Sequence, residues 1–453
     1  MDIIIVGCGK VGYTLVELLS SEDHNLVVID EKPERVSRIT DSLDAMGIVG
    51  NGIDHKTLLD AGIETADLLI AVTGDDEKNL LCCVIAKKSG RCQTIARVRN
   101  PIYNEESEFL KKELGIAMII NPDQTAALEI AKVFQFPSAL RVDTFSKSRM
   151  ELLHFKIGKE SPLLGMKLYS MNQSLRTNVL ACTCMRGDEV IIPNGSFEFQ
   201  ENDVITIAST RKNAIDFFRK IGNVKHRVST AILAGGGATS YYLAKSLLAS
   251  GIHVTIIDID PKRCDYLSEE LPDATIICGD ATDQNLLSQE GLEHAHGFAA
   301  LTGMDEENIL LSLYANEVSN ARTVTKINRL NFTSIINNLN LGSIVYPRVI
   351  TADYILKHVR STSFSRNSNV EKLYKLANGR VEALEFTIKE DSAVAGIPLL
   401  NLNLRPNTLV CCIYRKNRVI IPTGQDMMLA GDSVLVVISG YRISDIQEIL
   451  EDK

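Results

Sequence analysis

The 453-residue sequence has no tryptophan, no Cys-x-x-Cys pair and no clusters of lysine and arginine. Because zinc and disulfide frameworks need closely spaced ligands, the ten scattered cysteines indicate reduced, buried thiols and no metal site. The net charge of −9 and the absence of basic clusters argue against an extended nucleic-acid surface. We therefore expect no nucleic-acid partner.

Membrane and export signals are missing too. No run of about 18 apolar residues occurs, which excludes an ordinary membrane-spanning helix. A strand-like segment begins within two residues of Met1, which leaves no room for a signal peptide. The expectation is a cytosolic protein.

What the sequence does contain is a duplication. Gly7 returns as Gly235 and Asp30 returns as Asp258, both 228 residues further on and each in the same apolar setting. A whole unit of the nucleotide-binding type is thus duplicated in the sequence. We expect the fold and the function both to follow from this repeat.

Two types of secondary-structure pattern alternate along the chain and predict four domains, 1–136, 143–223, 228–360 and 370–453. In the first and third, short apolar strands alternate with helical patterns, which is typical of a Rossmann-like parallel sheet. In the second and fourth, short strands are separated by Gly, Pro, Asn and Asp turns. The predicted fold class is α/β, with two Rossmann-like parallel-sheet domains, each followed by a small α+β domain, and the Ser- and Asn-rich segment 360–369 is interpreted as an exposed linker.

Individual elements follow from the same patterns. The six strands predicted for the first domain are Asp2–Val6, Leu26–Ile29, Ala45–Val49, Leu68–Val72, Thr94–Val98 and Met118–Asn121. The second domain is predicted to contain strands Glu151–Ile157, Val179–Arg186, Val190–Ile192 and Val204–Ala208, and a closing helix Arg211–Ile221.

The first glycine motif has the full context of a dinucleotide-binding loop, because it follows a buried strand and opens a helix. Gly7 allows the tight turn, Gly9 lets the backbone approach a pyrophosphate, and Gly12 allows close packing of helix and strand. The helix N-terminus and Lys10 supply positive charge for phosphates. Asp30 is placed for ribose hydroxyls, which favours NAD(H) or an adenine nucleotide over NADP.

The second copy departs from this pattern. Gly235 and Gly237 are kept, but Ser240 replaces the third glycine and Ala238 stands in place of the lysine. Weaker binding, a different nucleotide and an empty structural copy all remain open for this half.

Other polar residues lie at predicted carboxyl ends of strands, where ligands of open α/β sheets bind. Asn51 and Thr73 are two of them, and Arg97 and Arg99 are a further pair. Because these arginines alternate on one strand, only one of them is expected to face the crevice. Lys326 and Arg329 are the comparable basic residues of the second copy.

Three functions are compatible with these residues. An NAD-dependent dehydrogenase would use the glycine loop, but no carboxylate, Cys–His or Ser–His constellation accompanies either copy. A redox-sensing scaffold would bind NAD(H) and contact another cytosolic protein. A regulatory subunit would bind a nucleotide without turnover, so no enzyme activity is expected.

The whole chain resembles the tandem regulator-of-potassium-conductance (RCK) subunits of Trk-type potassium-uptake systems. The motifs that carry the resemblance are Gly7-x-Gly9-x-x-Gly12 with Asp30, Gly279-Asp280-Ala281-Thr282, Ala300-Leu301-Thr302 with Asp305-Glu306-x-Asn308, and the turns at Gly165 and Gly396. The resemblance implies a peripheral membrane protein on the cytoplasmic face that binds NAD(H), ATP or ADP. It also implies a ring, commonly a tetramer, that controls a membrane-embedded potassium transporter subunit.

The resemblance also assigns site residues in both copies. The first site is expected at Gly7, Cys8, Gly9, Lys10, Val11, Gly12, Asp30, Glu31, Asn51, Gly52, Thr73 and Arg97. The second site is expected at Gly235, Gly237, Asp258, Asp280, Ala281 and Thr302, with Ser240 as the departure from the family pattern.

Overall fold

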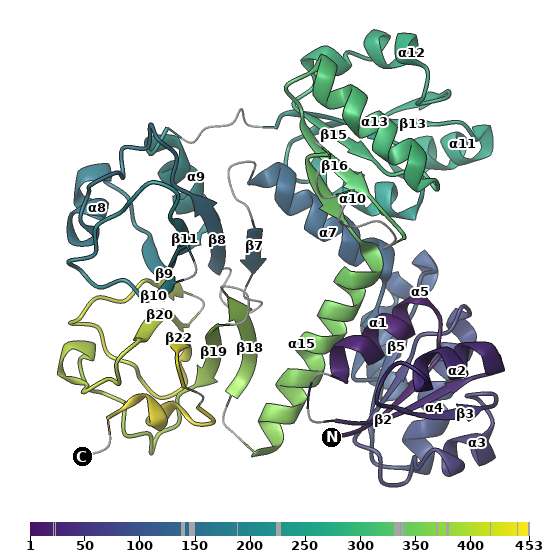
Figure 1. Cartoon of the computed structure of the whole chain (residues 1–453), viewed down its shortest axis with the longest axis horizontal. Helices are drawn as coiled ribbons and strands as arrows, with labels where there is room; N and C mark the ends of the chain where they lie inside the picture. The colour runs from purple at the N-terminus through teal and green to yellow at the C-terminus, as the bar shows by residue number, and fades with distance from the viewer. Residues whose placement is uncertain are drawn as a thin grey trace. The chain divides into compact units, whose positions relative to one another are not determined.

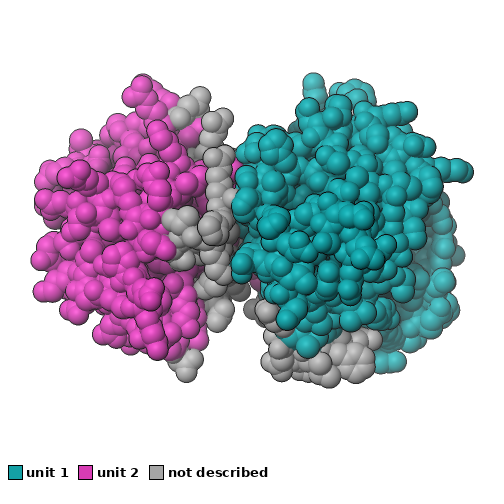
Figure 2. Space-filling view, turned by 90° about the horizontal axis from the view of Figure 1, so that it is seen from above, with its two compact units in different colours: residues 1–134, 228–356 teal, residues 135–227, 357–453 magenta. Residues whose placement is uncertain are grey.

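The computed structural model describes residues 1–20, 22, 24–136, 141–144, 150–187, 189–222, 228–329, 336, 339, 341–367, 370–376, 380–416, 418–441 and 443–451. Its contacts divide the chain into two compact units (Figure 2). Unit 1 combines residues 1–134 with 228–356, and unit 2 combines residues 135–227 with 357–453. The two Rossmann-like copies thus belong to unit 1, and the two small copies belong to unit 2. We retain the four predicted domain boundaries as a proposal.

Unit 1 contains two parallel six-stranded sheets (Figure 1). The first sheet has the order β3-β2-β1-β4-β5-β6, formed by β1 Asp2–Val6, β2 Asn25–Asp30, β3 Met46–Val49, β4 Leu68–Ala71, β5 Gln93–Arg97 and β6 Met118–Ile120. The second has the order β14-β13-β12-β15-β16-β17, formed by β12 Thr230–Ala234, β13 His253–Asp258, β14 Thr275–Cys278, β15 Gly297–Ala300, β16 Arg322–Lys326 and β17 Ser343–Val345. All six strands predicted for the first sheet are confirmed to within one residue at each end.

Helices cover both sheets. Those of the first half are α1 Lys10–Leu19, α2 Pro33–Thr40, α3 His55–Asp60, α4 Asp76–Ser89, α5 Pro101–Glu105, α6 Ser107–Leu114 and α7 Pro122–Gln135. Those of the second half are α10 Ala238–Leu248, α11 Pro261–Glu270, α12 Gln284–Gln289, the 3-10 turn η1 Leu292–His294, α13 Asp305–Val318 and α15 Pro347–Asn367. The strand order reverses between β1 and β4, which places a ligand crevice outside their carboxyl ends.

Helix α7 joins the two halves of unit 1 into one core. Its apolar face, with Ile130 and Phe134, packs in one cluster with Leu233 of β12 and Leu243 and Leu247 of α10, all of them buried. A second contact between the halves is a hydrogen bond of 2.9 Å that Tyr354 of α15 donates to Glu129 of α7. The two Rossmann-type halves therefore share buried surface that neither could cover alone.

The linker predicted at 360–369 is wrong as far as the structure describes it. Residues up to Asn367 continue helix α15, which starts at Pro347 and is 21 residues long. Serine and asparagine are weak helix formers but do not end a helix as proline does. The two last residues of the predicted linker, 368 and 369, lie outside the described residues.

Unit 2 contains two antiparallel five-stranded sheets. The first has the order β10-β9-β11-β8-β7, with β7 Arg141–Thr144, β8 Met150–Lys156, β9 Leu180–Arg186, β10 Glu189–Ile191 and β11 Val204–Thr210, and with helices α8 Leu168–Leu175 and α9 Arg211–Lys220. The second has the order β18-β19-β22-β20-β21, with β18 Val370–Leu376, β19 Val381–Thr387, β20 Thr408–Arg415, β21 Arg418–Ile420 and β22 Ser433–Ser439, and with 3-10 turns η3 Leu399–Asn401 and η4 Ile446–Ile449. Sequence reasoning missed β7 and α8, whose apolar periodicity is weak.

The duplication reappears in the buried ion pairs of unit 2. Arg186 binds the buried carboxylate of Asp203 through two nitrogens, each at 2.8 Å. Arg415 binds Asp432 in the same bidentate way at 2.8 and 2.6 Å. Such planar pairs fix the direction of a strand end as well as its stability.

Two further findings concern membrane spans and thiols. None of the helices in the described part of the chain combines the length and the hydropathy of a membrane span. All ten cysteines are free thiols and nine are buried, as expected, but Cys278 is exposed because β14 is an edge strand and this is its last residue.

Candidate functional site

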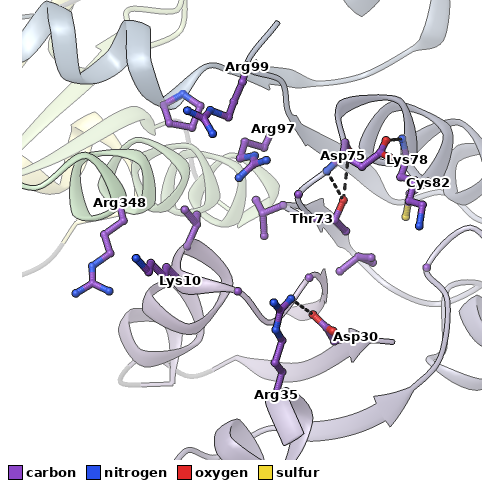
Figure 3. A pocket seen from close by; sticks show the side chains of 18 of the residues that line it. Lys10, Asp30, Arg35, Thr73, Asp75, Lys78, Cys82, Arg97, Arg99 and Arg348 are labelled. Carbon is purple, nitrogen blue, oxygen red and sulfur yellow. Dashed lines mark hydrogen bonds and ion pairs between the residues drawn. The ribbon is translucent and has the colours of Figure 1, made fainter. Parts of the chain in front are cut away.

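A cavity of about 840 Å³ lies over the carboxyl ends of β1, β4 and β5 (Figure 3). The first half provides most of its wall, including Gly9, Lys10 and Thr73. The second half contributes Thr239, Gly303, Lys326, Asn328, Pro347 and Arg348. The cavity thus lies at the topological switch point of the first sheet and is completed by the other half of unit 1.

Two glycines allow the tight turn after β1. Gly7 has a φ of +103°, and a side chain there would meet the backbone of Thr73 at 2.8 Å. A Cβ on Gly12 would lie only 1.9 Å from the carbonyl oxygen of Gly7. Both positions therefore require glycine, as the sequence predicts, because the turn, helix α1 and strand β4 approach one another so closely.

Gly9 is different, since a Cβ there would meet no protein atom within 4 Å. It stands at the start of helix α1, whose first N–H groups receive no side-chain cap. Lys10 follows with an exposed side chain. Open space, free N–H groups and a cation at a helix N-terminus together make a suitable cradle for phosphate.

Asp30 lies at the end of β2, and its side chain is nearly buried. One carboxylate oxygen accepts a hydrogen bond of 2.7 Å from the backbone N–H of Cys8, and the other accepts one of 3.0 Å from Lys32. Arg35 of α2 lies 3.6 Å away. The carboxylate thus fixes the glycine loop and still lines the cavity, where its remaining lone pairs suit ribose hydroxyls.

Arg97 ends strand β5 and lines the cavity. Its Nε atom is buried and has no hydrogen-bond partner among the described residues. Burial, and then the neighbouring Arg99, lower the pKa of Arg97, although an arginine remains charged at neutral pH. A guanidinium with a buried, unused Nε donor fits an anionic ligand, such as a phosphate group.

The expectation that only one of the two arginines faces the crevice is wrong, because Arg99 lines the cavity as well. Strand β5 ends at Arg97, so the alternation of side chains does not extend to Arg99. Arg99 is largely exposed and bonds Asp123 of α7 at 3.1 Å. Asp123 also accepts a hydrogen bond of 2.9 Å from Thr239, which ties the two halves together at the cavity.

The second half adds two cations. Lys326 donates a hydrogen bond of 2.8 Å to the carbonyl of Leu301, and burial lowers its pKa. Arg348 stands in the first turn of α15, and its buried Nε has no partner among the described residues. Figure 3 shows Arg348 on the side of the opening near Lys10, with Arg97 and Arg99 also around it.

Most of the residues predicted for the first site come together here. Those that line the cavity are Gly7, Gly9, Lys10, Val11, Asp30, Glu31, Asn51, Gly52, Thr73 and Arg97. Cys8 and Gly12 are buried behind the wall, where they shape the loop. Sequence reasoning missed Arg35, Lys78 and Arg348 as lining residues; the first two lie on helices near the motifs, whereas nothing in the local sequence points to Arg348.

The residues predicted for the second site occupy equivalent places in the second half. Gly235 has a φ of +98° beside Thr302, and Asp258 accepts hydrogen bonds from the backbone N–H groups of Gly236 and Asp260. Asp280 accepts from the backbone and hydroxyl of Thr282, and Ala281 is buried.

The loop of this half is closed more tightly than that of the first half. The hydroxyl of Ser240 donates a hydrogen bond to the carbonyl of Gly235, and Arg263 donates one of 2.6 Å to Gly236. Gly237, like Gly9 in the first half, would place a Cβ in open space. Whether this half holds a ligand stays a prediction.

Two Rossmann-type halves, a glycine loop with a near-buried aspartate and a basic cavity define a tandem protein of the nucleotide-binding Rossmann class. Comparison of the sequence gives the particular family. Residues 3–122 and 231–347 match the TrkA-N domain, and residues 152–222 and 383–451 match the TrkA-C domain. The chain belongs to the TrkA family.

Curated relatives agree over their whole length. "Trk system potassium uptake protein TrkA homolog 1" of Methanosarcina mazei is 30% identical over 457 residues, which covers 99% of each chain. "Trk system potassium uptake protein TrkA" of Halomonas elongata is also 30% identical over 457 residues, covering 100% of this chain and 99% of the relative.

Solved structures share the fold. The "GsuK channel bound to NAD" superposes with a TM-score of 0.62 and 18% identity, covering 97% of this chain and 76% of that one. The "GsuK RCK domain" gives the same TM-score and identity, with 97% and 92% coverage. The predicted fold class is confirmed.

Proposed function

We propose that this chain is the nucleotide-binding regulatory subunit of a Trk-type potassium-uptake system. The observation that carries the proposal is the cavity of unit 1, in which a glycine loop, a near-buried aspartate and cations from both halves meet. Membership in the TrkA family supports the potassium system, and the NAD named for the similarly folded GsuK channel supports the ligand class.

NAD(H), ATP and ADP all fit the chemistry of this cavity. Each has an adenosine ribose for Asp30 and at least two phosphates for the helix N-terminus. They differ in the group attached to the second phosphate, which is a nicotinamide ribose in NAD(H), a third phosphate in ATP and nothing further in ADP. Lys326 and Arg348 belong to the second half, so a longer or more highly charged ligand contacts both halves.

This division of the wall suggests how a ligand acts without turnover. A nucleotide shifts a conformational equilibrium only by its difference in affinity for the two states. Phosphates held between Arg97 of the first half and Arg348 of the second half bind best when the halves stand at one separation. Occupancy of the cavity thereby selects a conformation of unit 1.

The selected conformation is proposed to act through a ring of four chains on the cytoplasmic face of the membrane. The ring would be held peripherally against the membrane-embedded transporter subunit, and its shape would open or close the transport pathway. Family membership supports this arrangement, in which both Rossmann-type halves of every chain belong to the ring.

A dehydrogenase is the less suitable interpretation of the same cavity. Among the residues that line it, none is a histidine, and its one cysteine is Cys82. Burial raises the pKa of Cys82 to about 12, so this thiol is neutral at physiological pH. A hydride-transfer enzyme needs a poised acid or base beside the nicotinamide. Lys326, the lining lysine whose pKa burial lowers, is already engaged by the carbonyl oxygen of Leu301.

Replacing Asp30 by alanine tests the site. Calorimetric titration of NADH, NAD, ATP and ADP into the wild-type chain is expected to give binding, and Asp30→Ala is expected to weaken it about tenfold, because a charge-assisted hydrogen bond contributes about 1.5 kcal/mol.

Asp258→Ala removes the equivalent carboxylate from the second half and serves as the matched control. It should leave the affinity of the first site unchanged. Equal affinities in wild type and Asp30→Ala would contradict the assignment, and a loss confined to Asp258→Ala would move the site to the second half. Thermal melting of both variants checks that they are folded.

A further inference from the structure

Two cysteines of the second half lie near the carboxyl ends of β13 and β14. Cys264 is on α11 and is buried, with 6% of its surface exposed. Its sulfur lies 3.3 Å from the carbonyl oxygen of Asp258 and 3.9 Å from that of Ile277. Cys278 follows Ile277 directly and pairs with Asp258 across strands β13 and β14. The sulfur of Cys264 therefore lies against the backbone of both strands beside Cys278, and Cys278 is exposed to solvent.

The first half carries valines at both of these places. Val36 on α2 is 5% exposed, as buried as Cys264, and Val49 pairs with Asp30 as Cys278 pairs with Asp258. Val49 is exposed, like Cys278. Apolar packing alone is therefore served by valine at these positions, and the thiols give the second half a chemistry that the first half does not have.

We propose that Cys264 and Cys278 form a reversible disulfide when the protein meets a peroxide. This inference is independent of the nucleotide in the first-half cavity. It places an oxidant-responsive pair in the second half where the first half has Val36 and Val49.

The order of reaction follows from exposure. Cys278 is open to solvent, so its sulfur attacks hydrogen peroxide, the O–O bond breaks, and a sulfenic acid and one water form. Burial, and then the neighbouring Cys278, raise the pKa of Cys264 to about 11. Cys264 is therefore a neutral thiol until the sulfenic acid has formed on Cys278. Its sulfur then displaces hydroxide from the sulfenic acid, and its proton leaves in a second water. Two thiols and one peroxide thus give one disulfide and two waters.

The bond would tie helix α11 to the end of β14. Asp258 neighbours both cysteines, and Asp280 follows Cys278 by two residues. Both carboxylates belong to the predicted second site, in which Asp258 is the equivalent of Asp30. A disulfide here therefore restricts the part of the second half that a nucleotide would have to enter.

Two buried cysteines of unit 2 serve as an internal control for Cys264 and Cys278. Cys182 and Cys411 belong to one apolar cluster, and both are fully buried, with 0% exposed. A peroxide cannot reach them in the folded protein. They are expected to stay reduced under conditions that oxidise Cys278.

The test is a peroxide titration of the reduced, full-length chain, followed by alkylation and peptide mapping. Trypsin leaves both cysteines in one peptide, residues 264–322, so a protease that cleaves after Glu269 and Glu270 is used to separate them. The expected result is a disulfide-linked pair of these peptides, a loss of two of the ten free thiols, and full recovery with dithiothreitol.

Three variants complete the test. Cys264→Val should leave Cys278 to be oxidised to sulfinic acid, and Cys278→Val should keep Cys264 reduced. The double variant Cys264→Val/Cys278→Val copies the first half and should be folded but lose none of its remaining thiols at low peroxide. The proposal is overturned if wild-type Cys278 is oxidised to sulfinic acid while Cys264 stays reduced, or if Cys182 and Cys411 react first.

Discussion

Replacing Arg97 by alanine should weaken nucleotide binding to the first-half cavity by roughly 30- to 150-fold. The buried Nε of this residue has no partner among the described residues, so its donor is available for a phosphate. Removing it leaves phosphate charge in a partly desolvated cavity without its partner, at a cost of about 2 to 3 kcal/mol. Calorimetry with ADP and NADH measures the change.

Arg99→Ala is the matched control for Arg97→Ala. Arg99 lines the same cavity, but its side chain is 58% exposed and already bonds Asp123. Because solvent screens an exposed charge, the loss should be no more than about fivefold. Similar losses for the two variants would show that Arg97 has no special role, and no loss in Arg97→Ala would exclude it as a phosphate ligand.

Gly12→Ala is expected to destabilise unit 1 by about 3 kcal/mol and to abolish nucleotide binding. The added methyl group would overlap the carbonyl oxygen of Gly7 at 1.9 Å, and that atom is backbone that cannot rotate away. Helix α1 must then move off strand β1, which takes the phosphate-binding loop with it. Denaturant unfolding monitored by circular dichroism gives the stability change.

The variant Gly9→Ala is expected to change nucleotide binding without changing the stability of the same loop. A methyl group at Gly9 meets no protein atom within 4 Å, and its φ of −72° suits alanine. The free energy of unfolding should change by no more than about 0.5 kcal/mol, while nucleotide binding is lost because the methyl group fills the space of the pyrophosphate. A Gly9→Ala variant that binds normally would place the phosphates elsewhere.

Local sequence signals predicted the first half of the site well. The turn at Gly7, the close contact at Gly12 and the aspartate that ends β2 are each determined within about thirty residues of chain, where motif spacing and strand periodicity apply. The six strands of the first sheet are short, apolar and bounded by polar turns, so their ends could be predicted to within one residue.

Features that depend on distant chain segments could not be predicted. Arg348 reaches the cavity because α15 begins beside it, although more than two hundred residues separate it from the glycine loop. Helix α7 packs its apolar face on the other half of unit 1, and an amphipathic pattern does not say which sheet a helix will cover.

Errors in the sequence reasoning arose where a local rule was extended too far. Alternation along a strand was applied to Arg99 beyond the end of β5, and polar composition was taken for a linker where α15 continues. Burial was expected for every cysteine, whereas Cys278 lies at the end of an edge strand and is exposed. In each case the tertiary position of the residue decided the outcome.

Potassium flux into vesicles tests the proposed function most directly. The membrane-embedded Trk transporter subunit is reconstituted with this chain, and flux is measured without nucleotide and with NADH, ATP or ADP. The wild-type chain should make the flux depend on the nucleotide, and Arg97→Ala should remove that dependence while still associating with the transporter. Flux that is indifferent to nucleotides, or equally responsive in wild type and Arg97→Ala, would contradict regulation through this cavity.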